Sequence, residues 1–108
     1  MNKLICALII ASIILVSGCT SFEEKVTVEE HCILHCQAAV QAEEDLSAGA
    51  CLSDNNPEWT VDDWVCDIAH NPRTDVDDQP ENQCEEYRNG NANHFVEVDT
   101  ECNLIKKN

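Results

Sequence analysis

The hydrophobic pattern begins with a nearly continuous apolar run over residues 4–16, preceded by the basic residue Lys3. As a helix, this run would rise about 20 Å, which is short of the roughly 30 Å hydrocarbon core of a bilayer. A basic start, a short apolar run and small residues after it are typical of an export signal rather than of a membrane-spanning helix. We therefore expect residues 1–18 to be a signal peptide that is removed on export.

Residues 28–48 carry apolar side chains at helical spacing, which predicts one long amphipathic helix. Thr27 is a good N-cap, and Glu30 three residues later completes a capping box. Gly49 is placed to end the helix in the left-handed conformation. Glu43 interrupts an apolar arc of about 120°, whose members are Val28, Cys32, Cys36, Ala39, Val40, Leu46 and Ala50.

Three later segments are predicted to be β-strands from their alternating apolar residues or their β-branched and aromatic content: residues 64–69, 94–98 and 102–105. In the first strand, Trp64, Cys66 and Ile68 would lie on one face. Turn-forming residues predict loops between these elements. The expected fold class is α+β, in which the long N-terminal helix packs on a small antiparallel sheet of about three strands within one domain, residues 27–108.

The residues Val16-Ser17-Gly18-Cys19 resemble the lipobox of prokaryotic lipoproteins. In that family the signal is cut before the cysteine, and the cysteine sulfur carries a diacylglyceryl group. The resemblance implies a lipid anchor on Cys19, with residues 19–26 forming the lipidated cysteine and a short tether. A two-chain lipid is enough for stable attachment, whereas a single acyl chain is marginal. The implied location is the cell envelope, on the extracytoplasmic side of a membrane.

The eight cysteines of the chain fall into three groups. Cys6 leaves with the signal, and Cys19 takes the lipid. Six cysteines remain in the exported domain: Cys32, Cys36, Cys51, Cys66, Cys84 and Cys102. An even number in a small exported domain predicts a disulfide framework, which such a domain needs because its apolar core is small.

The predicted helix restricts how these six cysteines can pair. Cys32 and Cys36 lie one turn apart on one face, and Cys51 lies past the end of the helix, about 22 Å along the axis from Cys36. A disulfide requires Cα atoms within about 7 Å of each other. We therefore predict a Cys51–Cys66 bond. The helical cysteines, Cys32 and Cys36, then bond to the two C-terminal ones, Cys84 and Cys102, in either order.

The charge of the chain excludes some partners and permits others. Its 108 residues carry 6 Lys+Arg and 21 Asp+Glu, a formal net charge of −15, which becomes −16 when Lys3 leaves with the signal. So acidic a domain lacks the basic patch of a nucleic-acid-binding protein. It would also not dock by charge on an anionic membrane, but it could attract a basic protein partner.

Two sets of residues could bind a metal. His31, Cys32, His35 and Cys36 form two adjacent i, i+4 pairs on the predicted helix, and two histidines with two cysteines can bind zinc if the thiols are free. Asp75, Asp77 and Glu86 are spaced as in a calcium loop, although Pro80 stands where such a loop needs glycine. Oxidised cysteines and a solvated acidic loop are the structural alternatives to these two sites.

We expect no enzymatic activity and no cofactor. His70 and His94 lie near the ends of predicted strands, but neither has a nucleophile motif beside it, and paired cysteines leave no free thiol. The sequence thus predicts a lipid-anchored extracytoplasmic binding or structural module, with a basic protein as one candidate partner. A metal-binding envelope lipoprotein, using calcium or zinc, is the alternative.

The second half of the chain carries a further resemblance. Its segments 64–73 (WVCDIAHNPR), 81–84 (ENQC) and 94–99 (HFVEVD) are similar to the C-terminal part of small exported proteins of uncharacterised function, mostly archaeal. The resemblance covers roughly residues 51–105 and brings no activity with it. It implies that this half is a recurring module and favours an archaeal host, while a bacterial host stays open.

Overall fold

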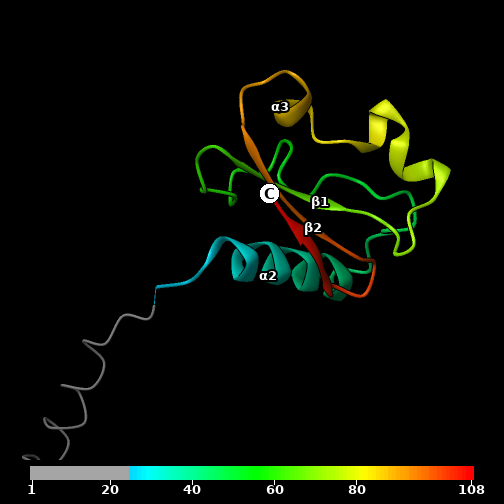
Figure 1. Ribbon diagram of the computed structural model, residues 1–108. Helices are drawn as coiled ribbons and strands as arrows, with labels where there is room; N and C mark the ends of the chain where they lie inside the picture. The colour runs from blue at the N-terminus through cyan, green and yellow to red at the C-terminus, as the bar shows by residue number, and fades with distance from the viewer. Residues whose placement is uncertain (1–24) are drawn as a thin grey trace, which may run out of the picture.

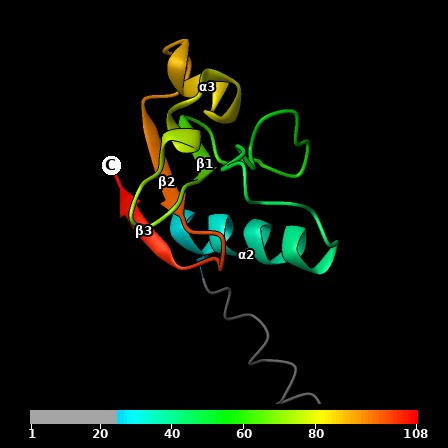
Figure 2. The same ribbon diagram turned by 90° about the vertical axis from the view of Figure 1, so that its right-hand side faces the viewer.

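The computed structural model describes residues 25–108, which Figures 1 and 2 show in two views. The predicted signal peptide and the predicted lipid-bearing residue, Cys19, lie outside the described residues. Within residues 25–108, no helix combines the length and the apolar character needed to cross a membrane. A principal helix, a three-stranded sheet and three disulfides confirm the expected α+β, disulfide-stapled fold class.

Helix α2 spans Val28–Gln41 and begins as the sequence predicts. The hydroxyl of Thr27 accepts a hydrogen bond from the backbone N–H of Glu30 at 3.2 Å, and the Glu30 carboxylate accepts one from the N–H of Thr27 at 3.3 Å. This capping box satisfies N–H groups that the start of a helix leaves without partners. The buried residues of the helix are Cys32, Cys36 and Ala39.

The prediction that this helix continues to residue 48 was wrong. Glu43 adopts the left-handed conformation, with φ of 59°, directly after the helix C-cap. Glu43, Glu44 and Asp45 bring three negative charges to the negative end of the helix dipole, where they are unfavourable. The Asp45 carboxylate instead accepts hydrogen bonds from the backbone N–H and the hydroxyl of Ser47, which fixes a turn.

The sheet contains three strands in the order β1-β2-β3: β1 (Trp64–Ile68), β2 (His94–Val98) and β3 (Leu104–Lys107). Strands β2 and β3 are antiparallel, as predicted, but β1 and β2 are parallel, so the expectation of an antiparallel sheet was wrong for that pair. Side-chain alternation tells which face a residue takes, not which way the strand runs. The long connection over residues 69–93 provides the crossover that a parallel pair requires.

The two faces of the sheet are covered by different parts of the chain. Helix α2 contacts all three strands on one face, and the principal core between them includes the fully buried side chains of Ile68, Val96 and Val98. The crossover holds three short helices: η1 (Asp75–Asp78), η2 (Pro80–Asn82) and α3 (Glu85–Arg88). A smaller core, which includes Val65 and Cys84, joins the crossover to the other face.

Three disulfides join all six cysteines of the described chain: Cys32–Cys66, Cys36–Cys102 and Cys51–Cys84. The first two attach α2 to β1 and to the turn before β3. The third attaches the segment beside β1 to the N-cap of α3. The Cys36–Cys102 bond is one of the pairings that the sequence left open.

The predicted Cys51–Cys66 bond was wrong. Cys66 faces α2, as the strand alternation predicts, and bonds to Cys32. Cys51 instead forms an isolated antiparallel bridge with Asp67, the next residue along β1. Because neighbouring residues of a strand point to opposite faces, Cys51 is directed away from the α2 side and bonds to Cys84.

Candidate functional site

A pocket of about 570 Å³ lies on the sheet face opposite α2, and we call it the sheet-face pocket. Its floor comes from all three strands, and its walls come from the crossover, including α3. The floor residues are Val65 and Asp67 of β1, Phe95 and Glu97 of β2, and Lys106 of β3. The wall residues are Arg73, Gln83, Cys84, Tyr87 and Arg88.

The register of the sheet brings three charged side chains into one row across the floor. Asp67 is paired with Glu97 in the parallel ladder, and Glu97 is paired with Lys106 in the antiparallel one. Directly paired residues point to the same face with neighbouring side chains close together. Two carboxyl groups therefore lie side by side, with an ammonium group on the far side of Glu97.

Asp67 is the most perturbed member of this row. Its Oδ1 atom is buried and has no hydrogen-bond partner among the described residues. Burial, and then the negative charge of Glu97, raises the pKa of Asp67 to about 8. The carboxyl group therefore keeps its proton at neutral pH and can donate a hydrogen bond as well as accept one.

Arg73 connects the wall of the pocket to its floor through hydrogen bonds. Its Nε donates to Asp78 Oδ1 and its Nη1 donates to Glu97 Oε2, both at 2.8 Å, while Nη2 donates to the backbone oxygen of Asp77 at 3.2 Å. The hydrogen bond to Asp78 is the largest of the effects that raise the pKa of Arg73, so this side chain stays charged. The guanidinium thus pairs with Glu97 and connects η1 to β2.

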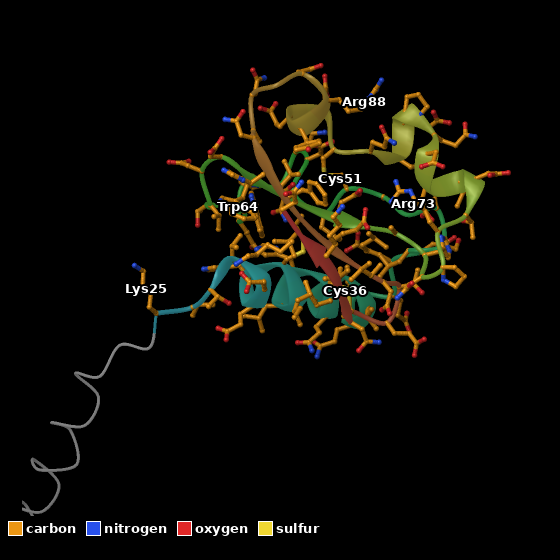
Figure 3. All side chains as sticks on the ribbon, in the orientation of Figure 1. Lys25, Cys36, Cys51, Trp64, Arg73 and Arg88 are labelled. Carbon is orange, nitrogen blue, oxygen red and sulfur yellow. A yellow bond between two sulfur atoms is a disulfide. The ribbon has the colours of Figure 1, made fainter. Side chains whose placement is uncertain are left out.

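The other two cations of the pocket, Arg88 and Lys106, form no such ion pairs in the described chain. Within residues 25–108, neither Arg88 nor Lys106 has a carboxylate oxygen within 4.0 Å. Lys106 Nζ lies 5.6 Å from the centre of the Phe95 ring, and the Tyr87 ring meets the Phe95 ring edge-on at 5.1 Å between centroids. In Figure 3, Arg88, the last residue of α3, lies on the far side of the sheet from Cys36. Two cations without a carboxylate partner among the described residues therefore lie in the same pocket as the aromatic rings of Tyr87 and Phe95.

The structure contradicts the proposed zinc site of His31, Cys32, His35 and Cys36. Both cysteines are oxidised in buried disulfides, so they offer no thiolate ligand. The two histidine rings instead meet the ring of Trp59 edge-on, with centroid distances of 6.4 and 5.4 Å.

The proposed calcium ligands Asp75, Asp77 and Glu86 do not gather within the described residues. Asp77 is 2 % exposed and accepts hydrogen bonds from the backbone N–H groups of His70 and Thr74, so it organises its own loop. The metal-like cluster that residues 25–108 do contain is Cys51, Asp54 and Cys84. Its two sulfur atoms are bonded to each other, which excludes it as a metal centre.

The histidines have structural partners. His70 Nδ1 lies 2.9 Å from Asp77 Oδ1, and His70 shares a shallow hollow with Ser47. The Ser47 hydroxyl, however, donates to Asp45 at 2.6 Å. His94 stacks on Trp64 at 4.6 Å between ring centroids. Neither arrangement forms the nucleophile–base hydrogen bond that covalent catalysis needs.

The sheet-face pocket was missed as a site by sequence reasoning. Two signals point to it in retrospect. Asp67 interrupts an otherwise apolar strand, and Arg73 and Arg88 are the only two arginines of the whole chain. Neither signal predicts the crossover that brings these residues to one face of the sheet.

No protein-family model matches the chain, no curated protein matches it, and no solved structure matches it.

Proposed function

We propose that the protein is a lipid-anchored, non-enzymatic binding module on the extracytoplasmic side of a membrane, and that the sheet-face pocket is its ligand site. The lipobox-like segment at Cys19 supports the anchor. Three disulfides are typical of an oxidising compartment outside the cytoplasm, which supports export.

One observation carries the choice of the pocket. In a chain with 21 acidic residues, three of the six basic ones, Arg73, Arg88 and Lys106, line a single hollow. Such convergence of polar groups over an aromatic surface is typical of small-molecule sites. The carboxyl group of Asp67 also lines the hollow, and its Oδ1 atom has no hydrogen-bond partner among the described residues.

The test is a fragment screen against the intact protein in nanodiscs of zwitterionic lipid, followed through its backbone amide NMR signals. The library should hold anionic, neutral and cationic fragments in equal numbers. We expect shifts concentrated at the floor and α3 residues of the pocket. Fragments that shift only amides elsewhere, or no amides at all, would remove the pocket as the binding site.

A second candidate function is binding of a basic protein through the acidic exterior. It is favoured by exposed acidic residues in two stretches of the chain: Glu43, Glu44 and Asp45 after α2, and Asp75, Asp78, Glu81, Glu85 and Glu86 along the crossover. Attraction of this kind is screened by salt. Affinity for a captured basic partner should therefore fall steeply between low and high ionic strength, and salt-independent affinity would rule the mode out.

A further inference from the structure

We infer that the sheet-face pocket takes a small organic anion with an aromatic or aliphatic body, whose charge is met by Lys106 and Arg88 and whose polar end is hydrogen-bonded by Asp67. This inference rests on the proposed function and specifies the ligand class of the same site. It stands on the chemistry of three parts of the pocket, as the described residues form it: an apolar part formed by Val65, Phe95 and Tyr87, two cations without a carboxylate partner, and a carboxyl group with one unpartnered oxygen.

The apolar part of the pocket suits the body of such a ligand. Val65 and Phe95 are opposite each other in the ladder, and the ring of Tyr87 stands edge-on to Phe95. Aromatic side chains favour offset or edge-to-face contact with a further ring. The pocket volume of about 570 Å³ lies within the range of small-molecule sites.

The charges of the pocket select an anion. Glu97 is already paired with Arg73, which also pairs with Asp78. Lys106 and Arg88 have no such partner within the described chain, so a ligand anion can pair with them without breaking an existing ion pair. A ligand cation would meet uncompensated positive charge here.

Asp67 adds to the preference for an anionic ligand at neutral pH. While protonated, it presents no negative charge to a ligand and can donate a hydrogen bond to an anionic oxygen. The charged groups that act on the pKa of Asp67 are Glu97 on β2 and Arg73 and Asp77 on the crossover. Lys106 on β3 and Arg88 on α3 line the same pocket. Ionisation of Asp67 above about pH 8 would place a second negative charge in the floor and weaken binding of an anion.

The test compares three probes with one ring: benzoate, benzyl alcohol and benzylamine. Their affinities for the intact protein in zwitterionic nanodiscs are measured at pH 7 through the amide shifts of the pocket residues. We expect benzoate to bind about tenfold more tightly than benzyl alcohol, the gain of one charge-assisted hydrogen bond. Equal or tighter binding of benzylamine would overturn the inference.

Two neighbouring lysines supply a matched pair of variants. Lys106 lines the pocket, whereas Lys107 lies on the opposite face, where it contacts Trp64 and Glu29. K106Q and K107Q change the net charge equally, so only a local contact separates them. We expect K106Q to weaken benzoate binding about tenfold and K107Q to leave it nearly unchanged. Equal effects of the two variants would show that only the overall field acts, and would overturn the inference.

The role of Asp67 has its own readout. In the natural protein, benzoate affinity should fall between pH 7 and pH 9, whereas D67N, which has no proton to lose, should hold its affinity constant. A flat profile for the natural protein would remove Asp67 from the site. If the fragment screen finds pocket ligands that are neutral or cationic, the inferred ligand class fails while the proposed function stands; if it finds none, both fail.

Discussion

At the scale of single residues, Asp67 shows how a strand position can become a ligand-binding group. Its place opposite Glu97 is set by the parallel register of β1 and β2. Burial then favours the neutral form of its carboxyl group, because a charge is costly to remove from water. The same placement that makes Asp67 useful for binding also makes it a pH-dependent element of stability.

We predict that the stability of the protein falls as the pH rises toward 8. In the unfolded chain, Asp67 loses its proton near pH 3.9, whereas in the folded protein it keeps the proton to about pH 8. Between these values the folded state binds more protons, so the free energy of unfolding falls by at most about 1.4 kcal/mol per pH unit from this group. It should level off above pH 8.

Urea denaturation of the natural protein and of D67N between pH 5 and pH 9 measures this contribution. D67N should lack the slope that Asp67 produces, so the stability difference between the two proteins should change with pH. Parallel curves would contradict the prediction.

A second residue-scale prediction concerns two glycines with similar backbone conformations. Gly49 has φ of 72° and Gly90 has φ of 79°. A Cβ atom added at Gly49 would lie 2.5 Å from Asp77 Oδ1 and 3.0 Å from the backbone oxygen of Ile68. A Cβ atom added at Gly90 would meet nothing within 4 Å. Gly49 was predicted to end the helix; the structure instead uses it for close approach to the Asp77 loop.

G90A should therefore lose about 1–2 kcal/mol of unfolding free energy, the strain of alanine in the left-handed conformation. G49A should lose roughly 1–3 kcal/mol more, the usual range for overpacking. Thermal or chemical denaturation of the two variants gives the comparison. Equal losses would show that the contact around Gly49 yields without cost.

At the scale of elements, features that depend on residues close together in the sequence could be predicted. Features that depend on contacts between distant residues could not. The start of α2 was predictable because Thr27 and Glu30 cap each other within one turn. The end of α2 was not, because the apolar periodicity continues past the acidic residues that stop it. The three strands were predicted from their composition, although the third begins at Leu104 and not at Cys102, and continues to Lys107. The direction of β1, and with it the pocket and the partner of Cys51, depends on a crossover that leaves no periodic mark in the sequence.

The disulfides give a prediction at this scale. Replacing Cys51 and Cys84 by serine, or Cys36 and Cys102 by serine, should each cost about 3–4 kcal/mol, because each bond closes a long loop of the unfolded chain. Only the loss of Cys51–Cys84 should also loosen the pocket, since Cys84 lines it and precedes α3 directly.

Hydrogen exchange separates the two double variants. Amides of α3 should exchange faster without Cys51–Cys84, whereas they should keep their protection, relative to global stability, without Cys36–Cys102. Equal loss of α3 protection, relative to global stability, in both variants would show that Cys51–Cys84 has no particular effect on α3 and would contradict the prediction. Peptide mapping of the natural protein under non-reducing conditions checks the three pairings themselves.

At the scale of the whole molecule, the start of the described chain and the α3 side of the pocket lie toward opposite sides. The described chain begins at Lys25, next to α2, while Arg88 marks the α3 side beyond the sheet in Figure 3. A tether of six residues, 20–25, reaches at most about 20 Å. An anchor at Cys19 would therefore hold the domain close to a membrane.

The last prediction tests that anchor. With two acyl chains on Cys19, the natural protein should fractionate with membranes and yield an N-terminal peptide whose mass includes the lipid, because two chains together give an attachment that one chain does not. C19S should be exported without lipid, or retained uncleaved, and in neither case carry the diacylglyceryl mass. C6S is the matched control, since Cys6 leaves with the signal and its loss should change neither fractionation nor the mature mass. A natural protein whose Cys19 reacts with a thiol reagent and carries no lipid would contradict the anchor, while leaving the disulfide-stapled domain and its pocket as they are.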